Sequence, residues 1–196
     1  MDNSQLYKAA VELVKAIDKA TDESLPGEIS GIVKFHAKAA AAAGVASGWV
    51  PGMGGAALMA ASAACIWTMY GRINGKIDVP LGENIVKSVI SGITTNLVTQ
   101  FALVLGIVTV TSFIPIIGQV GTAVVVGTLG YGISIAAGII YIKTLTKVFK
   151  AGEDPTRLSK EELTDIAKNV AENEDVKGIM KEAKQEYKKA KKQGDV

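Results

Sequence analysis

Two long stretches of this chain contain no charged side chain. No Asp, Glu, Lys or Arg lies between Lys38 and Arg72, and none lies between Lys87 and Lys143. A helix on the surface of a water-soluble protein needs a charged or polar outer face. The two stretches therefore cannot form ordinary surface helices.

Each uncharged stretch is interrupted by the same short motif. An apolar residue, a Pro, two further residues and a Gly follow one another in VPGMG (50–54) and in IPIIG (114–118). Pro disfavours a helical conformation in the residue before it, and Gly permits the backbone of a tight reversal. We interpret the motifs as the tips of two helical hairpins, duplicated with a period of about 64 residues. The expected tip residues are Pro51, Gly52, Gly54, Pro115 and Gly118.

The apolar segments beside these tips predict helices. Their β-branched residues would suit strands equally well. Length decides for helices, because strands longer than about 20 residues are rare, whereas about 20 apolar residues suit a membrane-spanning helix. We therefore predict an all-α fold with about four apolar helices. They are expected near residues 29–47, 56–71, 83–112 and 121–150, with the turn-forming segment 72–84 between the two halves.

The two ends of the chain differ from the middle. Residues 4–20 show the spacing of an amphipathic helix, and Ser159 with Glu162 forms a capping-box pattern ahead of another helix. The predicted organisation has three parts. They are an amphipathic N-terminal helix at 1–28, a duplicated hydrophobic hairpin domain at 29–150 (29–72 and 83–150), and a charged helical tail at 151–196.

Basic residues flank the predicted hairpins and are absent from both tips. If the hairpins enter a bilayer, this distribution places both chain ends and the connecting segment on the cytoplasmic side. The N-terminus also lacks the apolar core of a secretory signal. We expect a protein of the cytoplasmic membrane with its termini facing the cytoplasm and membrane lipids as partners. The first two helices are short for a full crossing, so spanning, partial insertion and packing in a soluble bundle all stay open.

Small residues recur at four-residue spacing on two of the predicted helices. This spacing lets helices approach closely in lipid. Packing of the two hairpins within one chain and self-association into a homo-oligomer both explain it. The candidate packing residues are Gly130, Ser134, Gly138, Ala56, Ala60 and Ala64.

The sequence contains no recognisable catalytic, cofactor or metal site. Gly52, Gly54 and Ala57 match a dinucleotide fingerprint, but the strand and the acidic residue that this motif requires are missing. His36 is the single histidine and Cys65 the single cysteine, so neither has the partners of a standard metal site. We therefore expect a protein that is not an enzyme. Nucleic-acid binding is not expected either, because the basic residues are scattered among acidic ones.

The two Pro-Gly phrases, with a turn-rich polar segment between them, resemble part of a known group of proteins. VPGMGG and FIPIIGQVG look like the hydrophobic helical domains of an uncharacterised GTPase-associated membrane-protein family, and are similar to phrases in immunity-related GTPases. The resemblance covers about residues 30–148. It implies membrane association and a GTPase partner. The chain itself has no phosphate-binding G-x-x-x-x-G-K-[ST] motif, so nucleotide hydrolysis would come from another protein.

Three functions fit these observations. The first is a non-enzymatic membrane protein that acts in membrane association, remodelling or scaffolding, with a GTPase as a possible partner. The second is a pore-forming protein or toxin. The third is a soluble helical bundle that binds a lipid or a protein partner.

Overall fold

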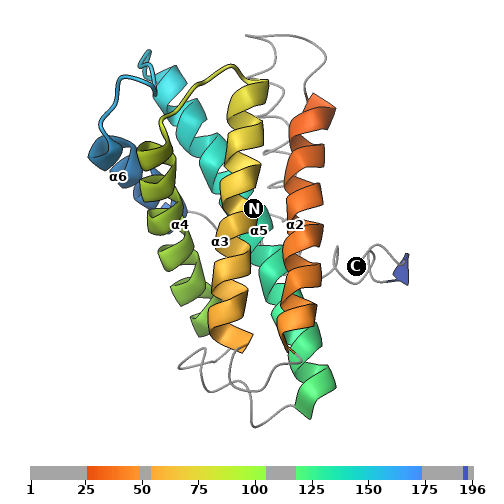
Figure 1. The fold of residues 1–196 in the computed structure, drawn as a ribbon. Helices are drawn as coiled ribbons and strands as arrows, with labels where there is room; N and C mark the ends of the chain where they lie inside the picture. Colours follow the sequence, from red (N-terminus) through yellow and green to blue (C-terminus); the bar gives the residue numbers. More distant parts are fainter. Residues whose placement is uncertain (1–25, 49–53, 105–117, 174–191, 194–196) are drawn as a thin grey trace.

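The computed structural model describes residues 26–48, 54–104, 118–173 and 192–193 (Figure 1). The predicted N-terminal helix at 4–20 and the second helical segment of the tail, from about Asp175, lie outside these residues.

The described part of the chain is all-helical, which confirms the predicted fold class. It contains five helices and no strand. The helices are α2 (Pro26–Gly48), α3 (Gly54–Lys76), α4 (Glu83–Val104), α5 (Gly118–Lys150) and α6 (Lys160–Asn173).

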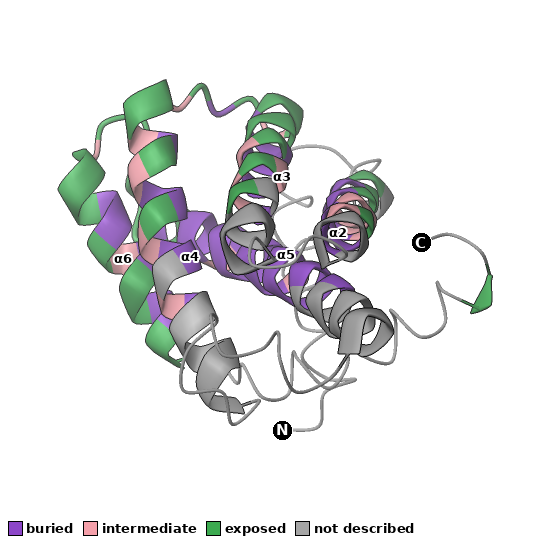
Figure 2. Cartoon of the chain, turned by 60° about the horizontal axis from the view of Figure 1, so that its bottom comes forward, coloured by how far each residue is buried: buried purple, intermediate pink, exposed green. Residues whose placement is uncertain are grey.

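Helix α5 is the centre of the bundle. It packs against α2, α3, α4 and α6, which form an arc along it (Figure 2). From Gly130 to Thr146 every residue of α5 is buried except Ile135 and Lys143, which are half-buried. A helix that is apolar on all sides has to be covered on all sides. The core of the molecule therefore lies along this helix.

The helices are arranged so that their charges gather at one end of the bundle. An ion pair between Glu28 and Lys76 joins the start of α2 to the end of α3. Figure 1 shows the start of α4 and the end of α5 at this same end, which we call the charged end. The opposite end, where Gly48, Gly54, Val104 and Gly118 lie, is called the uncharged end.

Helix α3 continues beyond the end that the sequence indicates. The segment 72–84 is predicted to be a turn-rich connection, but α3 runs on to Lys76. Ile73 and Asn74 are buried, and the Tyr141 hydroxyl donates a hydrogen bond of 2.5 Å to Asn74 Oδ1. These tertiary contacts stabilise a last helical turn that its two glycines weaken. The predicted boundary at Arg72 is therefore corrected to Lys76.

A left-handed residue ends α3. Asp78 has a φ of 54°, and the Val79 N–H donates to the Asn74 carbonyl oxygen at 3.0 Å. This bond and conformation form a Schellman-type helix end, in which the residue after the left-handed one packs back on the helix. Val79 is buried accordingly. The connection between α3 and α4 is thereby short and well defined.

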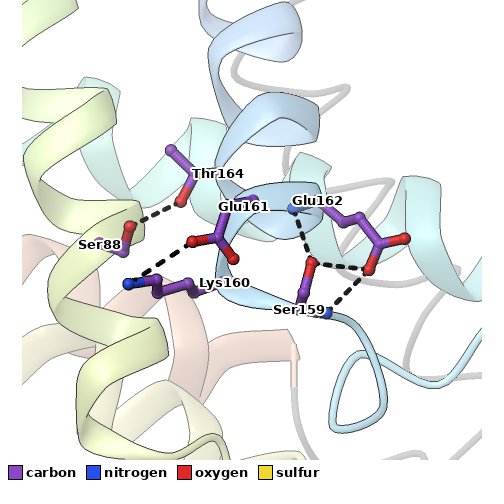
Figure 3. Close-up of polar contacts among 6 residues, drawn as sticks. All are labelled: Ser88, Ser159, Lys160, Glu161, Glu162 and Thr164. Carbon is purple, nitrogen blue, oxygen red and sulfur yellow. Dashed lines mark hydrogen bonds and ion pairs between the residues drawn. The ribbon is translucent and has the colours of Figure 1, made fainter.

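The first helix of the charged tail packs on the bundle. Its predicted capping box is confirmed, because the Ser159 N–H donates to the Glu162 carboxylate at 2.8 Å and the Glu162 N–H donates to Ser159 Oγ at 3.2 Å (Figure 3). Farther along α6, Thr164 Oγ1 and Ser88 Oγ of α4 share a hydrogen bond of 3.0 Å. Leu163 on the same side is fully buried. Helix α6 therefore shares the core of the hydrophobic domain.

Candidate functional site

A cleft of about 610 Å³ opens at the charged end of the bundle. One wall is α3, the opposite wall is the first turn of α4, and the connection between the two helices closes the end. The residues that α3 contributes recur every three or four positions, so they form one stripe of that helix. They are Trp67, Thr68, Gly71, Arg72, Asn74 and Gly75.

The connection and α4 supply the rest of the lining. Their residues combine apolar side chains with two carboxylates. They are Asp78, Val79, Pro80, Leu81, Glu83 and Val86. The cleft thus has apolar walls and a few charged groups, which is the composition typical of a binding site for a small molecule or a headgroup.

Two glycines in the α3 wall have no evident structural requirement. Gly71 and Gly75 lie one turn apart inside the helix, and neither has a positive φ. A Cβ atom added at either position would meet nothing within 4 Å. Each glycine weakens the helix by about 1 kcal/mol relative to alanine. Their effect in the folded protein is to leave two neighbouring positions of this wall without side chains.

The cleft carries one cation and one carboxylate that are not paired with each other. The guanidinium carbon of Arg72 lies 5.3 Å from the centroid of the Phe35 ring, and Arg72 makes no ion pair with a described residue. Asp78 is exposed and also has no ion pair within the described part of the chain. Both side chains are therefore available to a ligand.

The other charges at the cleft have partners. Lys87 forms an ion pair with Glu83 one turn earlier on α4. The Lys87 ammonium also lies 5.6 Å from the centroid of the half-buried Trp67 ring. Cations are attracted to the face of an indole at this distance. One face of Trp67 is thus already occupied by a cation of the protein itself.

The cleft lies at the boundary between the charged end and the uncharged part of the bundle. Arg72 is the first charged residue after one uncharged stretch, and Lys87 is the last before the other. Arg72 lines the α3 wall of the cleft, and the Lys87 ammonium lies beside Trp67 of the same wall.

His36 is a buried residue of α2 whose ring meets the Phe35 ring edge to face, with centroids 5.2 Å apart. Its side chain is only 5% exposed, and Nε2 has no hydrogen-bond partner in the described structure. Burial, and secondarily the positive charge of Arg72, lower the pKa of this imidazole. A buried histidine of this kind is neutral at pH 7. The described residues contain no group of three or more His, Cys, Asp or Glu side chains that could hold a metal ion.

Two of the predicted hairpin-tip residues lie at helix ends. Gly54 is the first residue of α3 and Gly118 the first residue of α5. Pro51, Gly52 and Pro115 lie outside the described residues.

The predicted packing residues fall into two groups. Gly130, Ser134 and Gly138 are buried on α5. A Cβ atom at Gly138 would lie 2.8 Å from Val33 Cγ1 and 3.4 Å from Met69 Sδ, so this glycine allows α5 to approach α2 and α3. On α3, by contrast, Ala60 and Ala64 are exposed, and Ala56 lies in the helix with its side-chain surroundings outside the described set.

One stretch within the described residues is long and apolar enough to cross a membrane. It is Gly130–Lys150 in α5, and 78% of the tested window is buried inside the molecule. The central helix of a water-soluble bundle has the same length and composition. The stretch by itself therefore supports membrane insertion only weakly.

No protein-family model, curated protein or solved structure matches this chain.

Sequence reasoning missed the cleft. The last part of its α3 wall falls in the segment 72–84, which is predicted to be a turn because it contains Asn74-Gly75, Asp78 and Pro80-Leu81-Gly82. A usable signal was present, since Trp67, Gly71 and Gly75 follow one another at the four-residue spacing of one helical face. That signal becomes visible only when α3 is known to continue to Lys76.

Proposed function

We propose that this chain is a non-enzymatic, membrane-associated helical protein. Its uncharged end enters the bilayer, and its charged end stays at the cytoplasmic surface. The observation that carries this proposal is the segregation of charge along the bundle axis. In α3, α4 and α5 every Asp, Glu, Lys and Arg belongs to the half nearer the charged end, and in α2 the last charged residue, Lys38, lies just past the middle, although the four helices alternate in direction (Figure 1).

The helix lengths support deep insertion. A helix rises about 1.5 Å per residue. The part of α3 between Arg72 and the uncharged end is therefore about 27 Å long, and the part of α4 between Lys87 and the uncharged end is about 25 Å long. The uncharged part of α5 below Lys143 reaches about 37 Å. The hydrocarbon core of a bilayer is about 30 Å thick. Three helices are therefore long enough to reach most of the way across.

Helix α2 limits the depth on its side of the bundle. Beyond Lys38 it continues for only about 15 Å before Gly48. A full crossing of the first hairpin is thus disfavoured. We propose that α2 with α3, and α4 with α5, are the two hydrophobic hairpins and that the first of them inserts only partly.

The central position of α5 is compatible with this arrangement. Its neighbours cover it, so α2 and α3 would present the lipid-facing surface, while α6 covers the side of α4 that carries Ser88 and Gly92. A bundle whose first hairpin inserts only partly is held at the membrane and acts there as a scaffold. Exposed Ala60 and Ala64 give α3 a smooth outer face that supports the proposal of a homo-oligomer. The GTPase partner is proposed on the resemblance of the Pro-Gly phrases.

Two experiments test the proposal. Membranes of cells that produce the protein are washed with alkaline carbonate, and the purified chain is floated with liposomes. We expect the protein to stay in the membrane pellet and to float with the vesicles. Release by carbonate together with a monodisperse species in the absence of detergent would contradict insertion and favour the soluble bundle.

Dye-filled liposomes separate the proposal from a pore-forming protein. A scaffold leaves the vesicles sealed at protein concentrations that give complete binding. Rapid loss of dye at the same concentrations would instead identify a pore former.

A further inference from the structure

We propose that the cleft between α3 and α4 binds the headgroup of a phospholipid that carries both a phosphate and a primary ammonium, as phosphoethanolamine does. The lipid source of this headgroup rests on the proposed function. The recognition chemistry rests on Arg72, Asp78, Gly71 and Gly75.

The phosphate is assigned to Arg72. A guanidinium presents a planar set of donors that matches the oxygens of a phosphate, and such charge-assisted bonds are stronger than neutral ones. Arg72 is exposed, lines the cleft and has no carboxylate partner among the described residues. The guanidinium carbon lies 5.3 Å from the centroid of the Phe35 ring, so this side chain also contacts α2.

The ammonium is assigned to Asp78. Its carboxylate lines the same cleft, and the helix end that fixes Val79 and Asn74 also fixes the backbone of Asp78. Arg72 and Asp78 do not neutralise each other, since no ion pair joins them. A cleft that keeps one cation and one carboxylate apart suits a ligand with both charges.

A primary ammonium fits better than a trimethylammonium group. The first donates hydrogen bonds to a carboxylate, whereas the second cannot donate and is usually held over the face of an aromatic ring. One face of Trp67, the aromatic ring in the lining, is already occupied by Lys87. Glu83 is likewise engaged with Lys87, which leaves Asp78 as the carboxylate for the ligand.

The glycines supply the space. Gly71 and Gly75 lie next to Arg72 and Asn74 in the wall of the cleft, and the positions of their missing Cβ atoms are open. Neither the backbone nor the packing calls for glycine at these positions. A ligand that lies against the helix explains both of them.

The position of the cleft agrees with a lipid ligand. Phosphates of a bilayer lie just outside its hydrocarbon core, where tryptophan side chains are also enriched. Arg72 and Lys87 are the last charges before the uncharged helices, and Trp67 lies one turn below Arg72. An inserted bundle therefore presents the mouth of the cleft at the level of the headgroups.

The test is flotation of the full chain with vesicles of phosphatidylcholine alone, or of phosphatidylcholine mixed with phosphatidylethanolamine or with phosphatidylglycerol. We expect phosphatidylethanolamine to raise the partition coefficient about tenfold, the effect of one or two charge-assisted hydrogen bonds. Arg72→Gln and Asp78→Asn should each remove this preference. Asn tolerates the left-handed conformation of residue 78, so the second variant keeps the end of α3.

Glycine variants separate binding from folding. Gly75→Ala should raise the melting temperature, because alanine favours the helix, and should lower the preference for phosphatidylethanolamine. Gly31→Ala is the matched control, since Gly31 is exposed on α2 with open space around its Cβ position and does not line the cleft. It should be equally stabilising and should keep the preference. Equal lipid preferences in the two variants would overturn the proposal.

A soluble ligand distinguishes failure of the cleft from failure of insertion. In the Trp49→Phe variant Trp67 is the single tryptophan, and its fluorescence is titrated with glycerophosphoethanolamine and with inorganic phosphate. A response to the first compound without flotation contradicts insertion and supports the cleft. Flotation with equal affinity for all vesicles, or equal binding of inorganic phosphate, supports insertion or a simple anion site and overturns the proposed headgroup specificity.

Discussion

The ring of Tyr70 on α3 lies flat against the ring of Tyr141 on α5. Their centroids are 3.8 Å apart and the ring planes differ by 8°. Each hydroxyl crosses to the other helix, because Tyr70 donates to the Ala137 carbonyl oxygen at 2.9 Å and Tyr141 donates to Asn74 Oδ1 at 2.5 Å. Both side chains are fully buried. The pair joins the end of α3, and hence the wall of the cleft, to the central helix.

Removal of the Tyr141 hydroxyl should lower the free energy of unfolding more than removal of the Tyr70 hydroxyl. Tyr141→Phe leaves the buried side-chain oxygen of Asn74 without its partner, which costs about 1–3 kcal/mol of the free energy of unfolding. Tyr70→Phe leaves a carbonyl in the middle of a helix, which keeps its helical hydrogen bond, so we expect about 0.5–1 kcal/mol. Denaturant unfolding of both variants measures the difference. Equal losses would show that Asn74 finds another donor.

Substitution of Gly138 should destabilise the contact between α5 and α2. Gly138→Ala forces its Cβ against Val33, and overpacking of a core costs about 1–3 kcal/mol. Val33→Ala in the same chain removes the clashing methyl groups and should recover part of that loss. A double-mutant cycle measured by thermal unfolding tests this coupling. Strict additivity of the two substitutions would contradict the close approach of the helices.

A charge on the outer face of the uncharged part should block insertion. Ala60 is exposed on α3, so Ala60→Glu is tolerated by the folded bundle but places a carboxylate at membrane depth. Acidic residues cost about 2.5–3.5 kcal/mol there, which predicts a loss of roughly 100-fold in liposome partition. Asn84→Glu is the control, because Asn84 is exposed at the charged end. Equal partition of both variants would argue that α3 stays outside the bilayer.

Stability should fall on mild acidification because of His36. Its pKa is lowered in the folded protein from the ordinary value of 6.5, mainly by burial and then by Arg72. The unfolded chain therefore takes up a proton at a higher pH than the folded chain does. The free energy of unfolding decreases as the pH falls through 6.5 towards the lower folded value.

The variant His36→Gln checks this assignment. Its melting temperature should vary less than that of the parent between pH 7.5 and 5. The carboxylates of Glu162 and Asp154 take up protons at a lower pH than His36 does, because hydrogen bonds from Ser159 and Thr156 lower their pKa values. Their contribution is lost only at more acidic pH. An unchanged pH profile in the variant would assign the effect to another group.

Several features of this protein can be predicted from composition and from short-range sequence patterns. The absence of charge in two long stretches and their length determined an all-α chain. Gly54 and Gly118 stand at the starts of α3 and α5, and Ser159 with Glu162 forms the capping box that its spacing predicts. These features depend on composition and on contacts within a few residues, so no knowledge of the tertiary structure was needed.

Other features were decided only by packing. Burial of Ile73 and Asn74 against α5 extends α3 through glycines that locally favour a turn, and this extension creates a wall of the cleft. The central place of α5 follows from its contacts with four other helices. The sequence by itself determined which segments avoid charge. The hairpin pattern also predicted that their charged neighbours lie on one side. The tertiary structure decided how far α3 continues and which helix the others pack against, because both depend on contacts between distant segments.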